Sequence, residues 1–71
     1  MADSVYKFIE LVGTSSESWE KAAAAAVTQA SKSLRDVRVG EIVQLDMTIE
    51  NGKIKSYRAK VKLSFKVESK G

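Results

Sequence analysis

The chain has 71 residues and a net charge of +3, and it contains neither histidine nor cysteine. This length leaves room for one domain, residues 1–71, which would bury only about 60% of its unfolded surface on its own. Disulfides and thiolate metal sites are excluded, as are imidazole ligands and bases, so oligomerisation or oxygen-ligated cations are the stabilising devices that remain.

The sequence carries no recognisable targeting or membrane-spanning element. Its start lacks a basic region followed by an apolar one, and no apolar run approaches the roughly 20 residues that span a bilayer. We therefore expect a soluble, cytoplasmic protein without a membrane partner. The charge is uneven, because residues 37–71 carry eight cations and four anions. A basic second half is typical of anion or nucleic-acid binding, but also of a solvated strand face.

Residues 5–12 are rich in β-branched and aromatic types, which predicts a first strand. Apolar side chains fall on both of its faces: Val5, Ile9 and Leu11 on one, and Tyr6, Phe8 and Val12 on the other. A strand in a small isolated sheet needs only one apolar face, so the second predicts burial against another subunit. Gly13 is expected to end the strand.

A helix is predicted over residues 16–34. Thr14, Ser15 and Ser16 are candidate N-caps, and Glu17 is placed for a capping box with Thr14 or as a first-turn anion. Apolar residues recur three and four apart, at Trp19, Ala23, Ala26, Val27, Ala30 and Leu34. We expect Trp19 to anchor the core rather than to stack on a ligand.

Residues 37–50 and 54–67 predict two further strands joined by a hairpin at Asn51-Gly52. The last strand alternates strictly, with apolar residues at odd positions and the cations Arg58, Lys60, Lys62 and Lys66 at even ones. The apolar residues of these two strands lie on the same sheet face only if odd-numbered residues of one strand pair with odd-numbered residues of the other. Such pairing would place Leu45 beside Tyr57. We therefore expect a three-residue loop, 50–52, with Gly52 left-handed in a bulge, and a second bulge near residues 40–42.

The order is strand, helix, strand, strand. A right-handed crossover makes the first two strands parallel, and the third fits between them. The predicted fold is α+β, with a three-stranded antiparallel sheet in the order first–third–second packed around one helix.

No catalytic constellation is visible, so we expect a protein that is not an enzyme. Glu17 and Glu20 are neighbours on the helix, but a solvated helix face accounts for them. The row of cations on the last strand fits a solvated face or an anion site. Nucleic-acid binding is disfavoured, because no aromatic residues interleave with these cations to stack on bases.

Four segments closely resemble the dodecin family, within a match that extends over nearly the whole chain: Val5–Ser15, Ser18–Ala22, Glu50–Lys53 and Ser56–Lys66. This resemblance implies a hollow homododecamer of strand–helix–strand–strand subunits. It also implies binding and sequestration of flavins, such as riboflavin or FMN, as stacked pairs at two-fold-related sites. Such a protein would buffer or protect its ligand without turning it over.

The sequence departs from the family pattern where flavin is held. The resemblance implies a flavin-stacking Trp at position 39 and a Gln at position 58, whereas this chain has Val39 and Arg58. Loss of a stacking platform costs roughly 1–3 kcal/mol per ring, judged from base stacking on aromatics. Flavin binding is therefore expected to be weakened or lost.

Val39, Tyr57-Arg58 and Asp46-Met47 resemble the calcium-binding type of dodecin. Oxygen ligands suit calcium or magnesium, and the resemblance makes Glu17 and Asp46 the candidate cation ligands. Each has a simpler explanation: helix-terminus electrostatics for Glu17, and a cross-strand pair with a cation of the last strand for Asp46.

The leading hypothesis is a dodecin-like storage oligomer with an altered flavin site that also binds divalent cations. The first alternative is a conventional flavin-binding dodecin in which Arg58 engages a flavin phosphate or ring carbonyl. The second is a basic nucleic-acid-binding module, which steep salt dependence of binding would reveal.

Overall fold

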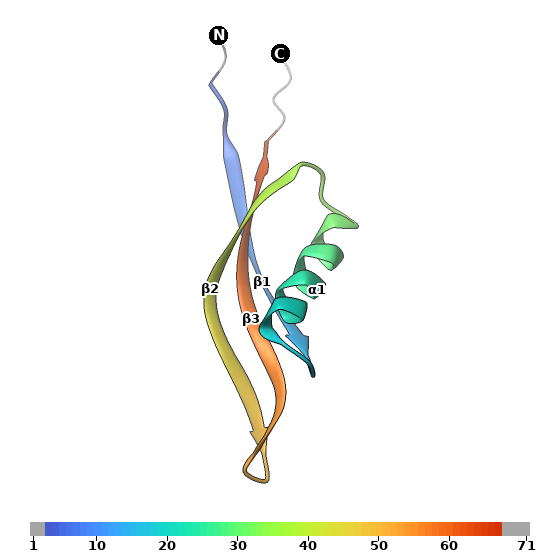
Figure 1. Cartoon of the computed structure of the whole chain (residues 1–71). Coiled ribbons are helices and arrows are strands. Elements are labelled where there is room, and N and C mark those ends of the chain that lie inside the picture. Colours follow the sequence, from blue (N-terminus) through green and yellow to red (C-terminus); the bar gives the residue numbers. More distant parts are fainter. Residues whose placement is uncertain (1–2, 68–71) are drawn as a thin grey trace.

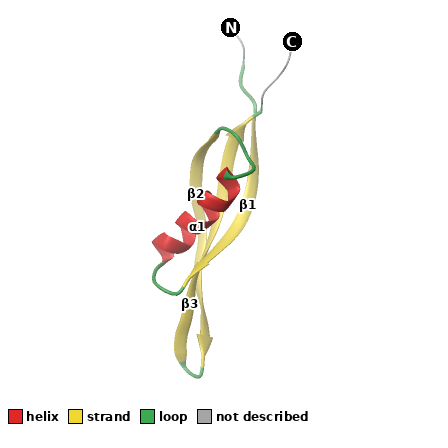
Figure 2. Cartoon of the chain, turned by 90° about the vertical axis from the view of Figure 1, so that its right-hand side faces the viewer, coloured by secondary structure: helices red, strands yellow, loops and turns green. Residues whose placement is uncertain are grey.

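A computed structural model describes residues 3–67 of the chain. The elements are β1 (Tyr6–Ser15), α1 (Trp19–Ser31), β2 (Val37–Glu50) and β3 (Lys53–Lys66). The three strands form one sheet in the order β1-β3-β2, and both edge strands run antiparallel to β3. One helix lies against one face of this sheet (Figures 1 and 2), which confirms the predicted α+β fold and its topology.

Strand β1 is longer than predicted, because Gly13 does not end it. Gly13 pairs with Ala59, and the ladder continues to Ser15 opposite Tyr57. A Cβ at Gly13 would overlap the backbone carbonyl of Ala22 and would lie 3.1 Å from the amide nitrogen of Ala26. The absence of a side chain at Gly13 therefore allows the strand and the helix to approach closely. This role could not be predicted from its place in the sequence before Thr14 and the two serines.

Helix α1 begins and ends inside the predicted range. Its N-cap is Ser18, whose hydroxyl accepts a hydrogen bond from the Lys21 amide at 3.0 Å. The predicted capping box is wrong: Thr14 stays in β1, and Glu17 precedes the helix, where its amide donates to the Ser15 hydroxyl at 3.0 Å. Beyond Ser31 the chain continues in tighter turns that no longer count as α-helix.

The β2–β3 hairpin confirms the predicted parity but not the predicted loop. Glu50 pairs directly with Lys53, so the loop has two residues, Asn51 (φ 54°) and Gly52 (φ 76°), as in a type I′ turn. Ile49 then faces Ile54, and the next pair is Thr48 with Ser56. Lys55 is therefore left unpaired, which shifts the register by one residue. Between Thr48 and Gln44, odd positions therefore do pair with odd ones.

The shifted register changes the predicted cross-strand partners, and β2 contains two further bulges. Leu45 pairs with Ala59 rather than with Tyr57. Strand β2 has register shifts between Val37 and Val39 and between Ile42 and Gln44. These flank the predicted bulge region at residues 40–42 instead of falling within it.

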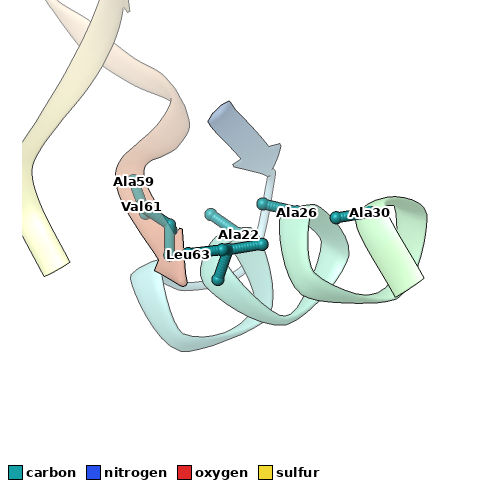
Figure 3. Packing of buried hydrophobic residues seen from close by; sticks show 6 residues of the cluster. All are labelled: Ala22, Ala26, Ala30, Ala59, Val61 and Leu63. Atoms are coloured by element: carbon teal, nitrogen blue, oxygen red, sulfur yellow. The ribbon is translucent and has the colours of Figure 1, made fainter. Parts of the chain in front are cut away.

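The core is small and consists mainly of alanine. Six hydrophobic residues are at most 5% exposed, and they interdigitate between α1 and β3 (Figure 3): Ala22, Ala26, Ala30, Ala59, Val61 and Leu63. The small helix side chains let the helix lie close to the sheet. The predicted helix stripe is right for Ala26 and Ala30, but it misses Ala22 and wrongly includes Val27, which is exposed.

The molecule is elongated, with extents of 57 × 20 × 13 Å and a radius of gyration of 15.0 Å. A compact domain of this length would have a radius of about 11 Å. Helix α1 packs mainly on β1 and β3, whereas β2 and the hairpin tip extend past it (Figure 1). Within residues 3–67, no helix has the length and apolar character needed to cross a membrane.

Candidate functional site

The sheet face opposite α1 carries three of the four residues singled out from the sequence. Side chains alternate across a strand, so the odd residues of β3 that pack on the helix leave the even residues on the other, open face. Cross-strand partners share a face. Val39 opposite Ser64, and Asp46 opposite Arg58, therefore lie on this open face together with the predicted row of cations.

Val39 belongs to an apolar patch at one end of the open face. It is 59% exposed and pairs with Ser64, whose other neighbour is Phe8, 62% exposed. Ser64 is buried between these larger side chains. The Lys62 ammonium lies 5.7 Å from the centre of the Phe8 ring, within the range of a cation–π contact. The patch is open and apolar, but Val39 adds no ring to it.

Arg58 and Asp46 form a two-pronged ion pair farther along the same face. The Arg58 Nε donates to Asp46 Oδ1 at 2.8 Å, and its Nη2 lies 3.4 Å from Oδ2. The two side chains are 44% and 40% exposed, so the pair is neither buried nor fully solvated. The simpler explanation for Asp46, a cross-strand pair with a β3 cation, is the one found here.

Trp19 holds the backbone beneath this ion pair. Its indole Nε1 donates to the Asp46 carbonyl at 2.9 Å, which ties α1 to edge strand β2. The indole also meets the Tyr57 ring edge-on, with centroids 4.9 Å apart and an interplanar angle of 69°. Trp19 is half-buried and serves packing, as predicted, although it lies beside the alanine core rather than in it.

The two flavin-equivalent positions are not brought together within one chain. Val39 faces Ser64 and Asp46 faces Arg58, and these β3 partners are six residues apart. At about 3.3 Å per residue, the separation is roughly 20 Å. A ligand the size of a flavin ring could contact both positions only with the help of a second subunit.

Glu17 lies in the turn before α1, where its exposed carboxylate pairs with Lys21 four residues later. Among residues 3–67, no three carboxylates come close enough together to hold a metal ion. Calcium prefers six to eight oxygen ligands. Glu17 and Asp46 have suitable oxygens, but a complete shell would need carboxylates from several copies of the chain.

One pocket on the open face was not anticipated from the sequence. Its volume is about 120 Å³, and its lining residues come from all three strands: Val12, Gln44, Asp46, Arg58 and Lys60. Gln44 lies on this face with Asp46 by simple alternation, and the unpaired Val43 brings Glu41 and Val39 to the same face. The local loss of phase was visible in the sequence, but the residue that bulges was not.

The chain matches the Dodecin family over residues 5–68. It is 49% identical over 65 residues to a calcium dodecin from Mycobacterium tuberculosis, with 90% of each chain covered. It superposes on the crystal structure of a calcium-chelating calcium dodecin from the same species with a TM-score of 0.81 and 46% identity, covering 96% of this chain and 97% of that one.

Dodecin from Streptomyces coelicolor superposes on the chain with a TM-score of 0.91 at 34% identity, covering 99% of this chain and all of the other. The family match, the identities and the shared topology agree over nearly the whole chain. This chain therefore belongs to the dodecin family.

Proposed function

We propose that the protein is a non-enzymatic storage or sequestration oligomer, a homododecamer whose flavin site is altered and which binds divalent cations such as calcium. The observation that carries the proposal is the open sheet face itself. Where the family resemblance implies a stacking Trp and a hydrogen-bonding Gln, this face has exposed Val39 and an Arg58 already engaged by Asp46.

The chemistry of the chain favours binding over turnover. The sequence has no His and no Cys, the residues most often used as general base and as thiol nucleophile. The close contacts between charged groups in residues 3–67 are ion pairs between acids and bases on the surface. Such pairs neutralise each other and supply no activated nucleophile.

Self-association is supported by the apolar residues that the helix leaves uncovered. On the helix side of β2 and at the hairpin tip, large side chains are 36–65% exposed: Ile42, Leu45, Met47, Ile49 and Ile54. Contiguous exposed apolar surface of this kind marks interaction sites, and a small domain gains stability from covering it. Further copies of the chain are the partner implied by the family.

Calcium binding is supported by two observations. The relative from Mycobacterium tuberculosis is a calcium dodecin, and its crystal structure has a calcium-binding site. The present chain offers Glu17 and Asp46 as oxygen donors, and a closed oligomer repeats each carboxylate around its symmetry axes. Magnesium would be held less well, because it demands a tighter octahedral shell.

A fluorescence titration of riboflavin and FMN, run with and without calcium, tests the proposal. We expect little quenching by the parent protein and a rise of its melting temperature with millimolar calcium. Strong quenching would instead establish the conventional flavin-binding dodecin, with Arg58 engaging the flavin. If neither ligand had an effect, the storage proposal would lose both of its candidates.

A further inference from the structure

The cations of β3 on the open face are not equivalent, because their cross-strand neighbours differ. Arg58 lies opposite Asp46 and is paired with it. Lys62 lies between two acids, Glu10 of β1 and Glu41 of β2. Each of these two cations therefore has at least one acidic residue directly opposite it on a neighbouring strand, that is, in the same row across the sheet.

Lys60 lies between these two cations but has no acid in its row. Its neighbours are Val12 on β1 and Gln44 on β2, neither of which carries a charge. The Lys60 side chain is half-buried, and within residues 3–67 no carboxylate approaches its ammonium to within 4.0 Å. This leaves a positive charge that is partly removed from water and is not neutralised by the described part of the chain.

Lys60 lines the pocket of about 120 Å³ on this face. Each water molecule needs only about 10–15 Å³ of such space, so the pocket has room for a ligand larger than water. A tetrahedral oxyanion with four oxygens fits that space.

The remaining polar groups of the pocket complement an oxyanion. Gln44 can donate two N–H groups through its carboxamide. Arg58 uses Nε and Nη2 on Asp46, which leaves Nη1 free to donate to a ligand. The Asp46 carboxylate also lines the pocket, but its charge is compensated by Arg58, so Lys60 leaves the pocket with a net charge of +1.

We propose that this pocket binds a phosphate-class oxyanion, either inorganic phosphate or the phosphate of a small monoester, anchored by Lys60 and oriented by Gln44 and Arg58. The proposal goes beyond the proposed function, and because Arg58 and Asp46 also line this pocket, a flavin at Arg58 or a cation at Asp46 would compete with phosphate. One uncompensated cation, between a neutral pair of charges and the two acids beside Lys62, also fits one phosphate better than a nucleic-acid backbone.

Calorimetric titration of the full-length protein with inorganic phosphate, at constant ionic strength in chloride, tests the site. The parent should bind one phosphate per chain. Lys60→Gln should weaken binding about tenfold or more, because it removes a charged hydrogen-bond donor. Lys62→Gln is the matched control: it removes the same charge from the same face, next to Glu10 and Glu41, and should leave phosphate affinity within about twofold.

Gln44→Glu tests the same site without removing a cation. The new carboxylate would face Lys60 as Glu41 faces Lys62, so it should abolish phosphate binding while the melting temperature stays level or rises. Glycerol phosphate in place of inorganic phosphate distinguishes the two sources, because tighter binding of the ester assigns the site to a larger ligand. Equal phosphate affinity in the parent and Lys60→Gln, equal losses in Lys60→Gln and Lys62→Gln, or no binding to the parent would overturn the proposal.

Discussion

Val39 is a short β-branched side chain on the open sheet face, and its size determines what can stack there. Val39→Trp should provide a stacking platform beside Phe8 and should quench the fluorescence of bound flavin. One stacked ring contributes ~1–3 kcal/mol, so the affinity for riboflavin should rise by about tenfold. Thr28→Trp is the control, since it adds a tryptophan at an exposed position of α1, on the other side of the sheet from Val39.

Arg58→Gln should add to the effect of Val39→Trp. The two positions are roughly 20 Å apart in one chain, so any coupling between them must pass through a second subunit that shares the ligand. Fluorescence titration of the single and double variants measures that coupling. A double variant that binds riboflavin no better than the parent would show that the pocket is placed wrongly.

The ion pair of Arg58 with Asp46 makes calcium binding at Asp46 depend on Arg58. Asp46 can ligate a cation only by giving up a guanidinium that it contacts at 2.8 Å. If Asp46 is the ligand, Arg58→Gln should enlarge the calcium-induced rise in melting temperature and Asp46→Asn should remove it. If Glu17 is the ligand, Glu17→Gln should reduce the rise and Arg58→Gln should leave it unchanged. No calcium effect on the parent, with no heat of binding, would remove the cation hypothesis.

At the scale of elements, the contact between β1 and α1 depends on Gly13. Gly13→Ala would push a methyl group into the Ala22 carbonyl, which is rigid helix backbone. We expect a loss of about 3 kcal/mol or more in stability, the upper end for overpacking, measured by thermal unfolding at fixed protein concentration. Gly40→Ala is the control, because its methyl group would meet a side chain rather than backbone, the Leu63 methyl at 3.1 Å, which would have to move only slightly. Equal losses in both variants would contradict this account.

The three register shifts are the element-scale feature that places the candidate site. The unpaired Lys55 keeps Tyr57, Ala59 and the other apolar residues of β3 on the helix side despite a two-residue turn. The unpaired Val43 brings Val39 and Glu41 to the same face as Gln44 and Asp46. The alternation of apolar and polar residues indicates that a strand contains a bulge. Backbone hydrogen bonding between the strands decides which residue stays unpaired in it.

At the scale of the whole molecule, the thin, elongated shape predicts assembly. Light scattering at micromolar concentration should give twelve times the 7.8 kDa of one chain. Leu45→Asn, at an exposed apolar position of β2, should lower the assembled fraction, whereas Leu45→Met should preserve it because the apolar surface is kept. A mass near that of a single chain for the parent would contradict the homododecamer.

The sequence by itself determined the order of elements, the sheet topology and the face that each residue of β3 from Tyr57 onwards occupies. These follow from short-range physics: period-two alternation, alanine's helix propensity, the Asn51-Gly52 turn and the handedness of the crossover. The resemblance also identifies Val39 and Arg58 as the altered positions.

Only the tertiary structure decided where strands bulge, how far β1 runs and which charges meet. Gly13 stays in β1 because a helix lies against it, and Asp46 pairs with Arg58 because the Asn51-Gly52 turn and the unpaired Lys55 set the register there. Lys60 is left without an acid for the same reason, since a one-residue slip would change its cross-strand neighbour. Such pairings depend on residues far apart in the chain, and local pattern carries no information on their alignment.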